Sequence, residues 1–196
     1  MRLPKIIGLT GGIGSGKTTI ANYFKSFGIP VYITDEEAKK ITEFPEILNE
    51  IRILFGDEIF ENQILNRKKL ASIVFNDKNK LDKLNRIIHP AVQKDFENWL
   101  KNYSNSKFVI KESAILFETG NYKKCDFVIT VIVPIEERVK RIIIRDKCTK
   151  EDAYKRIENQ WTDEQRIEKS TYLIDNLELT EAKKQVDKII ANLSKI

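Results

Sequence analysis

The chain has 196 residues and a formal net charge of +5, and 41% of its residues are hydrophobic while 32% are charged. This composition is typical of a soluble globular protein of one domain with insertions, and it excludes a disordered chain. The sequence has no block of about five basic residues that would favour nucleic acid, and no apolar run approaches the ~18 residues of a membrane span. We therefore expect a cytoplasmic protein, monomeric or weakly oligomeric, whose partner is a small molecule rather than nucleic acid or a membrane.

Short runs of β-branched residues, bounded by turn residues, predict strands along the chain. The runs are KIIGL (5–9), GIPVYI (28–33), KFVIKE (107–112), CDFVITVIV (125–133) and TYLIDN (171–176). They are apolar on both sides, which is typical of strands buried on both faces of a parallel sheet. The two cysteines, Cys125 and Cys148, have no metal-ligand spacing, and we expect packed, reduced thiols.

Helical periodicity connects these runs. It predicts a helix between the first two strands, a closing helix from Thr180, and a helical insertion whose best segment, 67–103, is interrupted near 76–79 and at His89. A second insertion, rich in arginine and lysine, follows Pro134. We therefore predict an α/β fold with a doubly wound, parallel five-stranded sheet. Its core takes up about 1–34, 105–137 and 170–196 of a single domain, with helical insertions at about 35–104 and 138–169.

A glycine-rich segment lies between the first strand and its helix. Gly11, Gly16, Lys17 and Thr18 fit the pattern G-x-x-x-x-G-K-[ST], whose glycines let backbone N–H groups turn toward phosphate oxygens at a helix N-terminus. We expect Lys17 to be solvent-facing until a nucleotide binds and then to reach the β- and γ-phosphates, and the Thr18 hydroxyl to bind Mg²⁺. The predicted nucleoside triphosphate site consists of Gly11, Gly12, Ile13, Gly14, Ser15, Gly16, Lys17, Thr18 and Thr19.

Phosphate binding is compatible with three classes of protein: a small-molecule kinase, a switch GTPase and a transport ATPase subunit. The sequence NKLD (79–82) matches a guanine-reading pattern, but it falls in the helical insertion rather than after a buried strand. No aspartate is followed three residues later by glycine, as a GTPase switch requires, and no transport-type serine-glycine signature is present. These observations favour the kinase, with a nucleotide-hydrolysing switch protein as the less favoured alternative.

Acidic residues at the ends of two strands are candidates for the chemistry. Asp35 follows the second strand, and ligands of open parallel sheets gather beyond the carboxyl ends of strands, so Asp35 could accept the proton of an attacking hydroxyl. Glu36 and Glu37 fit an ordinary solvated helix start. Glu112 ends the third strand and fits either an Mg²⁺ site reached through water or a buried structural carboxylate.

Three arginines share one predicted helical face in the second insertion: Arg138, Arg141 and Arg145 stand at i, i+3 and i+7. Such a stripe is usually a solvated face. In a kinase, however, a mobile segment with arginines closes over the triphosphate and neutralises developing charge. We therefore include Arg141 and Arg145 among the catalytic candidates, with Lys17 and Asp35, and place Arg138 behind them.

Along nearly its whole length the sequence resembles the dephospho-coenzyme A kinases. LTGGIGSGKTT is similar to that family's phosphate loop, VYITDEEAKK to its D-A-D segment, and AILFETG to its P-L-L-F-E segment. NRKKLASIVF, LNRIIHPAV, TVIVPIEERVKR, TKEDAYKRIENQ and LIDN follow in the family's order. The departures from the family pattern are Ile33, Thr34, Asn66, Ala114, Ile115, Arg138 at a usual glutamine, Ser170 and Thr171.

The resemblance implies a P-loop kinase that transfers the ATP γ-phosphoryl to the ribose 3′-hydroxyl of dephospho-coenzyme A, with Mg²⁺. It implies that Asp35 is the base and that Asn176 lies near the adenine. It makes the first insertion the acceptor-binding region and the second the lid; another P-loop nucleoside or nucleotide kinase is the alternative. Arg67 fits an acceptor phosphate and a helix cap equally well, and we expect His89 to be structural.

Overall fold

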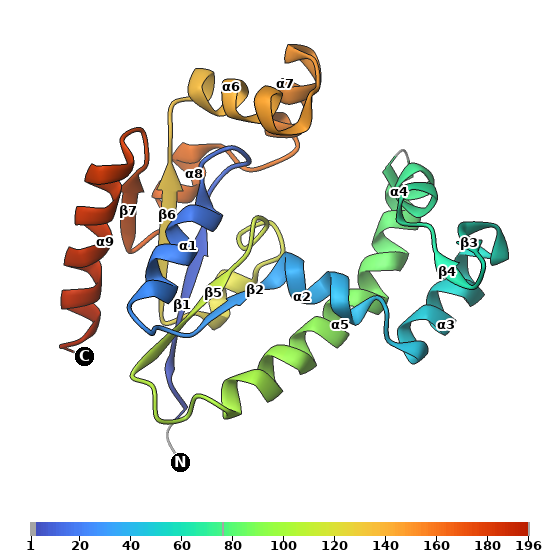
Figure 1. Cartoon of the computed structure of the whole chain (residues 1–196), viewed down its shortest axis with the longest axis horizontal. Helices are drawn as coiled ribbons and strands as arrows, with labels where there is room; N and C mark the ends of the chain where they lie inside the picture. The colour runs from blue at the N-terminus through green and yellow to red at the C-terminus, as the bar shows by residue number, and fades with distance from the viewer. Residues whose placement is uncertain (1–2, 76, 196) are drawn as a thin grey trace. The chain divides into compact units, whose positions relative to one another are not determined.

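The structure is a computed structural model that describes residues 3–75 and 77–195 (Figure 1). The chain divides into two compact units, Met1–Ile33 with Tyr103–Ile196, and Thr34–Asn102. No helix in the described part of the chain is both long and apolar enough to cross a membrane.

The first unit is built on a five-stranded sheet in the order β2-β5-β1-β6-β7. The strands are β1 (Lys5–Thr10), β2 (Val31–Ile33), β5 (Phe108–Glu112), β6 (Phe127–Ile132) and β7 (Tyr172–Asp175). Every neighbouring pair is parallel, and Leu9 of β1 lies between Glu112 and Ile129 in the register. The predicted doubly wound α/β sheet is confirmed, and all five strands fall inside the predicted runs, except that β1 extends one residue further, to Thr10.

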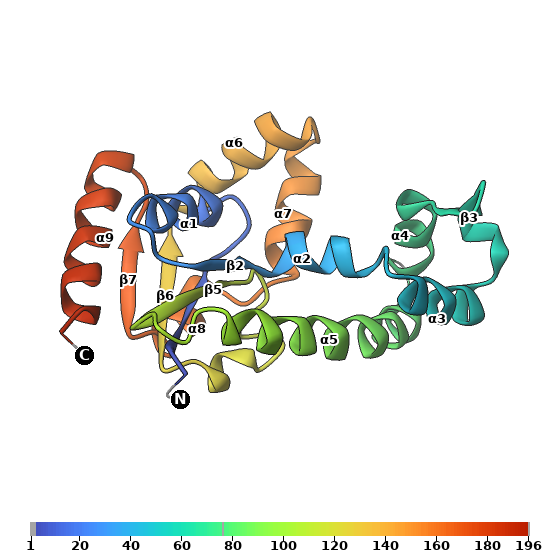
Figure 2. The same ribbon diagram turned by 60° about the horizontal axis from the view of Figure 1, so that its bottom comes forward.

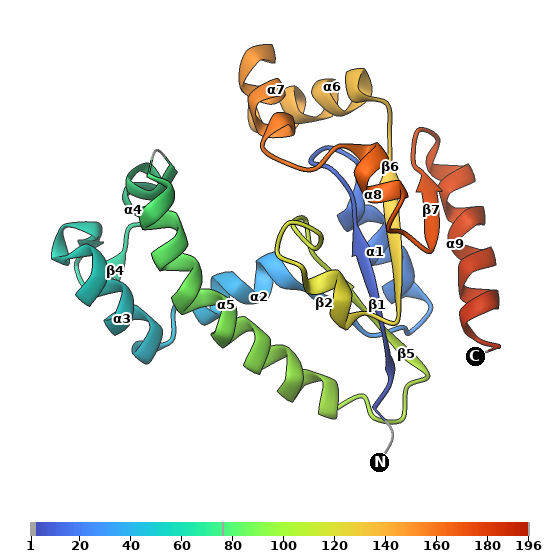
Figure 3. The same ribbon diagram turned by 180° about the vertical axis from the view of Figure 1, so that it is seen from behind.

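Helices cover both faces of this sheet. In Figures 1 and 3, α1 (Lys17–Ser26) and α8 (Asp163–Ile167) lie on opposite faces. One face of the sheet, with α1 and α9 (Leu179–Leu193), forms the main core, and its strand residues alternate along β1, β5 and β6 as the strand period requires. The buried members from these strands are Ile7, Leu9, Phe108, Ile110, Ile129 and Val131.

Two further helices follow β6 in the first unit, α6 (Ile135–Asp146) and α7 (Lys150–Glu158). They form the predicted second helical insertion together with α8. On the sheet face away from α1, Cys125 packs against a small cluster of buried residues that includes Phe117 and Val128. Burial raises the pKa of the Cys125 thiol to about 11, so this thiol stays protonated at neutral pH.

The second unit is mainly helical. It contains α2 (Thr34–Ile41), α3 (Pro45–Phe55), α4 (Arg67–Phe75) and α5 (Lys78–Lys101), with a 3-10 turn at Asp57–Ile59. It also contains an antiparallel hairpin, β3 (Phe60–Glu61) and β4 (Ile64–Leu65), that the sequence analysis missed. The turn residues Asn62 and Gln63 both have positive φ without any glycine, so the usual hairpin signal is absent from the sequence.

The predicted helix break at His89-Pro90 is wrong, because α5 continues from Lys78 to Lys101 with Pro90 inside it (Figure 2). A proline in a helix interior costs about 3 kcal/mol or more. The buried residues Leu84 and Val92 stand two helical turns apart on either side of Pro90, so breaking the helix would disrupt one continuous apolar stripe. The other predicted interruption is present, since α4 ends at Phe75 and α5 begins at Lys78; Asn76, also part of that expectation, lies outside the described residues.

The structure describes the surroundings of Arg67 and His89 in the second unit. Arg67, the first residue of α4, donates to the Lys39 carbonyl oxygen at 2.7 Å and pairs with Glu43 at 2.9 Å. Arg67 therefore ties the start of α4 to the end of α2. Desolvation lowers the pKa of His89 below its ordinary value, so its imidazole is neutral at pH 7.

Candidate functional site

The glycine-rich loop connects the buried end of β1 to the first turn of α1. Gly11, Gly14 and Gly16 have φ values of 150°, 82° and 87°, which side-chain-bearing residues rarely adopt. Gly16 is the N-cap of α1 and provides no side-chain cap, so the helix N-terminus is left to a ligand. Thr18 and Thr19 follow in the first turn with exposed side chains. The loop therefore has the form of an anion-binding concavity.

Lys17 is not solvent-facing, contrary to the sequence expectation. Its side chain is only 9% exposed, and Nζ donates to the carbonyl oxygens of Gly11 at 2.9 Å and Gly12 at 3.4 Å. The ammonium therefore lies inside the loop, where the curved backbone brings carbonyl oxygens within its reach. A bound phosphate would offer the ammonium negatively charged oxygens in place of these neutral carbonyl acceptors.

Side chains from distant segments hold the outward-facing carbonyl groups of the loop. Arg138 of α6 donates from Nε to the Ile13 oxygen at 2.9 Å, and Asn176 donates from Nδ2 to the Ser15 oxygen at 2.8 Å. In a trans peptide the carbonyl group and the next N–H point in opposite directions. Holding these two oxygens on the outer side therefore aims the N–H groups of Gly14 and Gly16 inward.

Asn176 is nearly buried, at 5% exposure, and was predicted to lie near an adenine. The structure gives its side chain the Ser15 contact, while its main-chain oxygen accepts a hydrogen bond from Nη2 of Arg141 at 3.0 Å. The adenine role of Asn176 stays a prediction.

The three predicted arginines have different partners. Arg138 is almost fully buried and pairs with Asp163, Arg141 pairs with Glu137, and Arg145 is exposed and makes a bidentate contact with the neighbouring Asp146. Burial lowers the pKa of the Arg138 guanidinium, although Asp163 opposes that shift, and the group stays charged. Arg138, which the sequence analysis had placed last, is thus hydrogen-bonded to the loop, and Nη1 of Arg141 lies beside Gly16.

Asp163 and Arg138 belong to a chain of four buried or half-buried charges. Arg166, which is fully buried, donates to Asp163 at 3.0 Å and to Glu118 at 3.3 Å, and Glu118 also accepts from the Trp161 amide at 3.0 Å. Signs alternate along this chain, so each charge has a desolvated opposite neighbour. The network connects α6, α8 and the segment after β5. No single sequence motif predicts it, because Glu118, Arg138 and the Asp163–Arg166 pair come from three separate segments.

The predicted metal-site residues both belong to the first unit. Glu112 is 3% exposed and ends β5, next to β1, while Thr18 is exposed at the start of α1. Within the ranges that the structure describes, no group of three or more His, Cys, Asp or Glu side chains could hold a metal ion. A Mg²⁺ ion bound with substrate phosphates needs only one or two protein ligands, so Thr18 and Glu112 fit that mode.

Asp35 belongs to the second unit, two residues after β2 ends at Ile33. It is exposed in the first turn of α2, beside Glu36 and Glu37. Glu37 pairs with Lys40 at 2.8 Å, as expected of a solvated helix start. The side chain of Asp35 is therefore free of burial and available to a ligand.

Comparisons with known proteins agree on one family. The family model described as dephospho-CoA kinase matches residues 5–181. A dephospho-CoA kinase of Fusobacterium nucleatum is 45% identical over 87% of this chain and 89% of its own length. A dephospho-CoA kinase of Bacteroides fragilis is 38% identical over 87% of this chain and 83% of its own.

Solved structures show the same likeness. A Thermus thermophilus protein has a TM-score of 0.90 at 31% identity, over 97% of this chain and 98% of its own. A dephospho-CoA kinase from Campylobacter jejuni has a TM-score of 0.67 at 25% identity, covering 98% and 99%. A shikimate kinase from Acinetobacter baumannii, at 16% identity and a TM-score of 0.53 with coverage of 98% and 94%, shares the fold alone.

Proposed function

This chain belongs to the dephospho-CoA kinase family, and on that premise we propose which of its residues carry out the family's reaction. The protein phosphorylates dephospho-CoA with ATP, in coenzyme A biosynthesis. The acceptor atom in our proposal is the ribose 3′-hydroxyl. The observation that carries the proposal is the loop from Gly11 to Thr19, in which side-chain contacts to the Ile13 and Ser15 oxygens aim the N–H groups of Gly14 and Gly16 inward.

Each part of the site has a role in this proposal. The loop from Gly11 to Thr19 binds the ATP phosphates, and Lys17 moves from its carbonyl contacts to the transferred phosphoryl group. Arg141 and Arg145 neutralise charge that develops on the phosphates. Asp35 orients the acceptor hydroxyl and takes its proton late in a largely dissociative transfer. The expectations of a cytoplasmic location and of a monomer stay predictions.

We also propose that Mg²⁺ accompanies ATP, with the Thr18 hydroxyl as ligand and Glu112 acting through water. When bound, the ion neutralises charge on the phosphate oxygens. The exposure of Thr18 at the α1 N-terminus and the carboxylate of Glu112 at the end of β5 support these assignments. Both residues offer the oxygen atoms that Mg²⁺ prefers.

Thr18→Val should raise the Mg²⁺ concentration needed for half-maximal rate by about tenfold, because valine keeps the shape of threonine but lacks the oxygen. Thr18→Ser, which keeps the hydroxyl, is the matched control and should stay close to wild type. The measurement is the initial rate at fixed ATP over a series of free Mg²⁺ concentrations. An unchanged Mg²⁺ dependence of Thr18→Val would assign the ligand elsewhere.

The acceptor is tested by ADP release with dephospho-CoA, adenosine, uridine, shikimate or no acceptor, each in ATP and in GTP. We expect dephospho-CoA with ATP to give the highest rate, by more than about tenfold over the other acceptors, since a site that binds the whole acceptor gains transition-state stabilisation from its remote parts. Equal ADP release without any acceptor would favour a nucleotide-hydrolysing switch. A preference for adenosine or uridine would favour another nucleoside kinase.

A further inference from the structure

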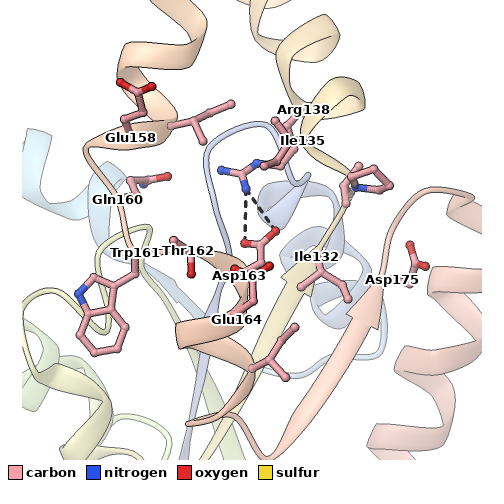
Figure 4. Close-up of a pocket in the computed structure, with 14 residues that line it drawn as sticks. Ile132, Ile135, Arg138, Glu158, Gln160, Trp161, Thr162, Asp163, Glu164 and Asp175 are labelled. Carbon is pink, nitrogen blue, oxygen red and sulfur yellow. Dashed lines mark hydrogen bonds and ion pairs between the residues drawn. The ribbon is translucent and has the colours of Figure 1, made fainter.

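One residue of the phosphate loop, Ile13, is held through both its main-chain N–H and its main-chain oxygen by the segment α6 to α8. The Ile13 N–H donates to Oε1 of Gln160 at 2.7 Å, and the Ile13 oxygen accepts from Nε of Arg138 at 2.9 Å. Gln160 lies between α7 and α8, and Arg138 lies in α6, as Figure 4 shows. We propose that Arg138 and Gln160 are positioning residues, which set the phosphate loop in its anion-binding form and couple nucleotide affinity to the placement of this segment.

We call the two hydrogen bonds from Arg138 and Gln160 to Ile13 the clamp. The geometry of the peptide planes explains how the clamp shapes the loop. Arg138 holds the Ile13 oxygen outward, so the N–H of Gly14 in the same peptide plane points to the other side. The Ile13 N–H donates to Gln160, so this N–H is not available to bind phosphate. The donors available to the anion thus begin at Gly14. This inference rests on the proposed function, since it concerns the site that binds ATP phosphates.

Gly12 shows how closely the clamp fits the loop. Gly12 does not have positive φ, so its backbone conformation does not demand glycine. A Cβ at Gly12 would overlap the Arg138 guanidinium, and a Cβ at Gly14 would crowd the Arg138 backbone. Glycine at positions 12 and 14 therefore allows α6 to approach the loop closely, in addition to allowing the loop to turn.

The clamp is not optimised for stability. Arg138 is 2% exposed, and among the described residues its Nη2 has no hydrogen-bond partner, although Nη1 pairs with Asp163 at 3.2 Å. A buried unpaired donor costs about 1–3 kcal/mol. Side chains that break packing rules in this way are concentrated at functional sites.

A pocket lies beside the segment, next to the polar contacts of Arg138. This pocket of about 650 Å³ is lined by residues of α6, α8 and the end of β6 (Figure 4). Its apolar walls include Ile132, Val133, Ile157 and Ile167. The two hydrogen bonds to Ile13 tie the segment to the loop, beside the packing of the Ile13 side chain against a cluster that includes Val139 and Ile142. The Arg138–Asp163 pair ties α6 to α8 within the segment.

The test compares Arg138→Gln with Arg138→Met. Glutamine carries an N–H as many bonds from Cα as arginine Nε, so it can still donate to Ile13, whereas methionine cannot. Both variants lose the guanidinium, and with it the Asp163 pair, to the same extent. By isothermal titration we expect the ADP Kd of Arg138→Met to exceed that of Arg138→Gln by about tenfold, with adenosine binding and the nucleotide-free Tm alike in the two.

Arg156→Met is the control, because Arg156 pairs with Asp146 away from the loop, and it should bind ADP as wild type does. Equal ADP affinities of Arg138→Gln and Arg138→Met would overturn the proposal. If Arg138→Met does not fold, Gln160→Met removes the other half of the clamp, and it should weaken ADP binding severalfold; unchanged affinity would count against the clamp. A wild-type protein that fails to bind ADP would instead contradict the proposed function.

Discussion

Lys17→Ala is expected to abolish measurable phosphoryl transfer, with a fall in kcat of at least about 10²- to 10³-fold, the effect of removing one preorganised donor to developing charge. The structure adds a consequence for stability, because Lys17 is buried and donates to Gly11 and Gly12. Loss of these contacts should lower the free energy of unfolding by about 1–3 kcal/mol. The measurements are steady-state kinetics at saturating substrates and urea denaturation.

Lys25→Ala is the matched control for this variant, since Lys25 lies in the last turn of the same helix with an exposed side chain. It should keep both the rate and the stability of the wild type. A folded Lys17→Ala protein that turns over at a near-normal rate would show that the loop is not the phosphate site. If the Lys17→Ala protein fails to fold, the same measurements are made on Lys17→Met, which keeps most of the buried aliphatic chain.

Asp35→Asn is expected to lower kcat by about 10²- to 10⁴-fold while the KM for ATP changes little. Asparagine keeps the shape of aspartate but cannot accept a proton, and it orients the acceptor hydroxyl less well. Asp35 is exposed at the start of α2, so its replacement removes no buried contact and should leave the Tm unchanged. The effect on rate would then report chemistry rather than folding.

Glu36 and Glu37 are internal controls for Asp35. They stand in the same helical turn, and Glu37 pairs with Lys40. Glu36→Gln and Glu37→Gln should stay within a few-fold of the wild-type kcat. If Asp35→Asn retains most of its activity while Glu112→Gln loses it, the base is not Asp35.

Much of the fold follows from local sequence signals. The five strands are recognisable because β-branched runs buried on both faces carry their own signal, and the glycine pattern locates the loop between β1 and α1. The hairpin at Phe60–Leu65 could not be predicted, because Asn62 and Gln63 adopt positive φ without glycine. The continuity of α5 through Pro90 was likewise hidden, since packing on both sides outweighs the local preference of proline.

The site was predictable only in part, for a related reason. A pattern of neighbouring residues identifies the loop, but the residues that hold its shape come from far along the chain. Gln160 is 147 positions from Ile13 and Asn176 is 161 from Ser15. The burial of Lys17 was missed because it depends on the curvature of the loop, which brings the Gly11 and Gly12 oxygens to Nζ.

The strand order has a consequence for how this chain assembles during synthesis. β1 is made first and occupies the middle of the sheet, yet Lys5 pairs with Phe108 and Ile7 with Phe127. While the ribosome translates the whole of the second unit, β1 lacks both of its neighbouring strands, β5 and β6. Contacts so distant in sequence close slowly, and exposed apolar strands are prone to aggregation in the meantime. The helical unit Thr34–Asn102, by contrast, is one continuous stretch of sequence, so all of its residues are synthesised before β5 and β6, the two neighbours of β1 in the sheet.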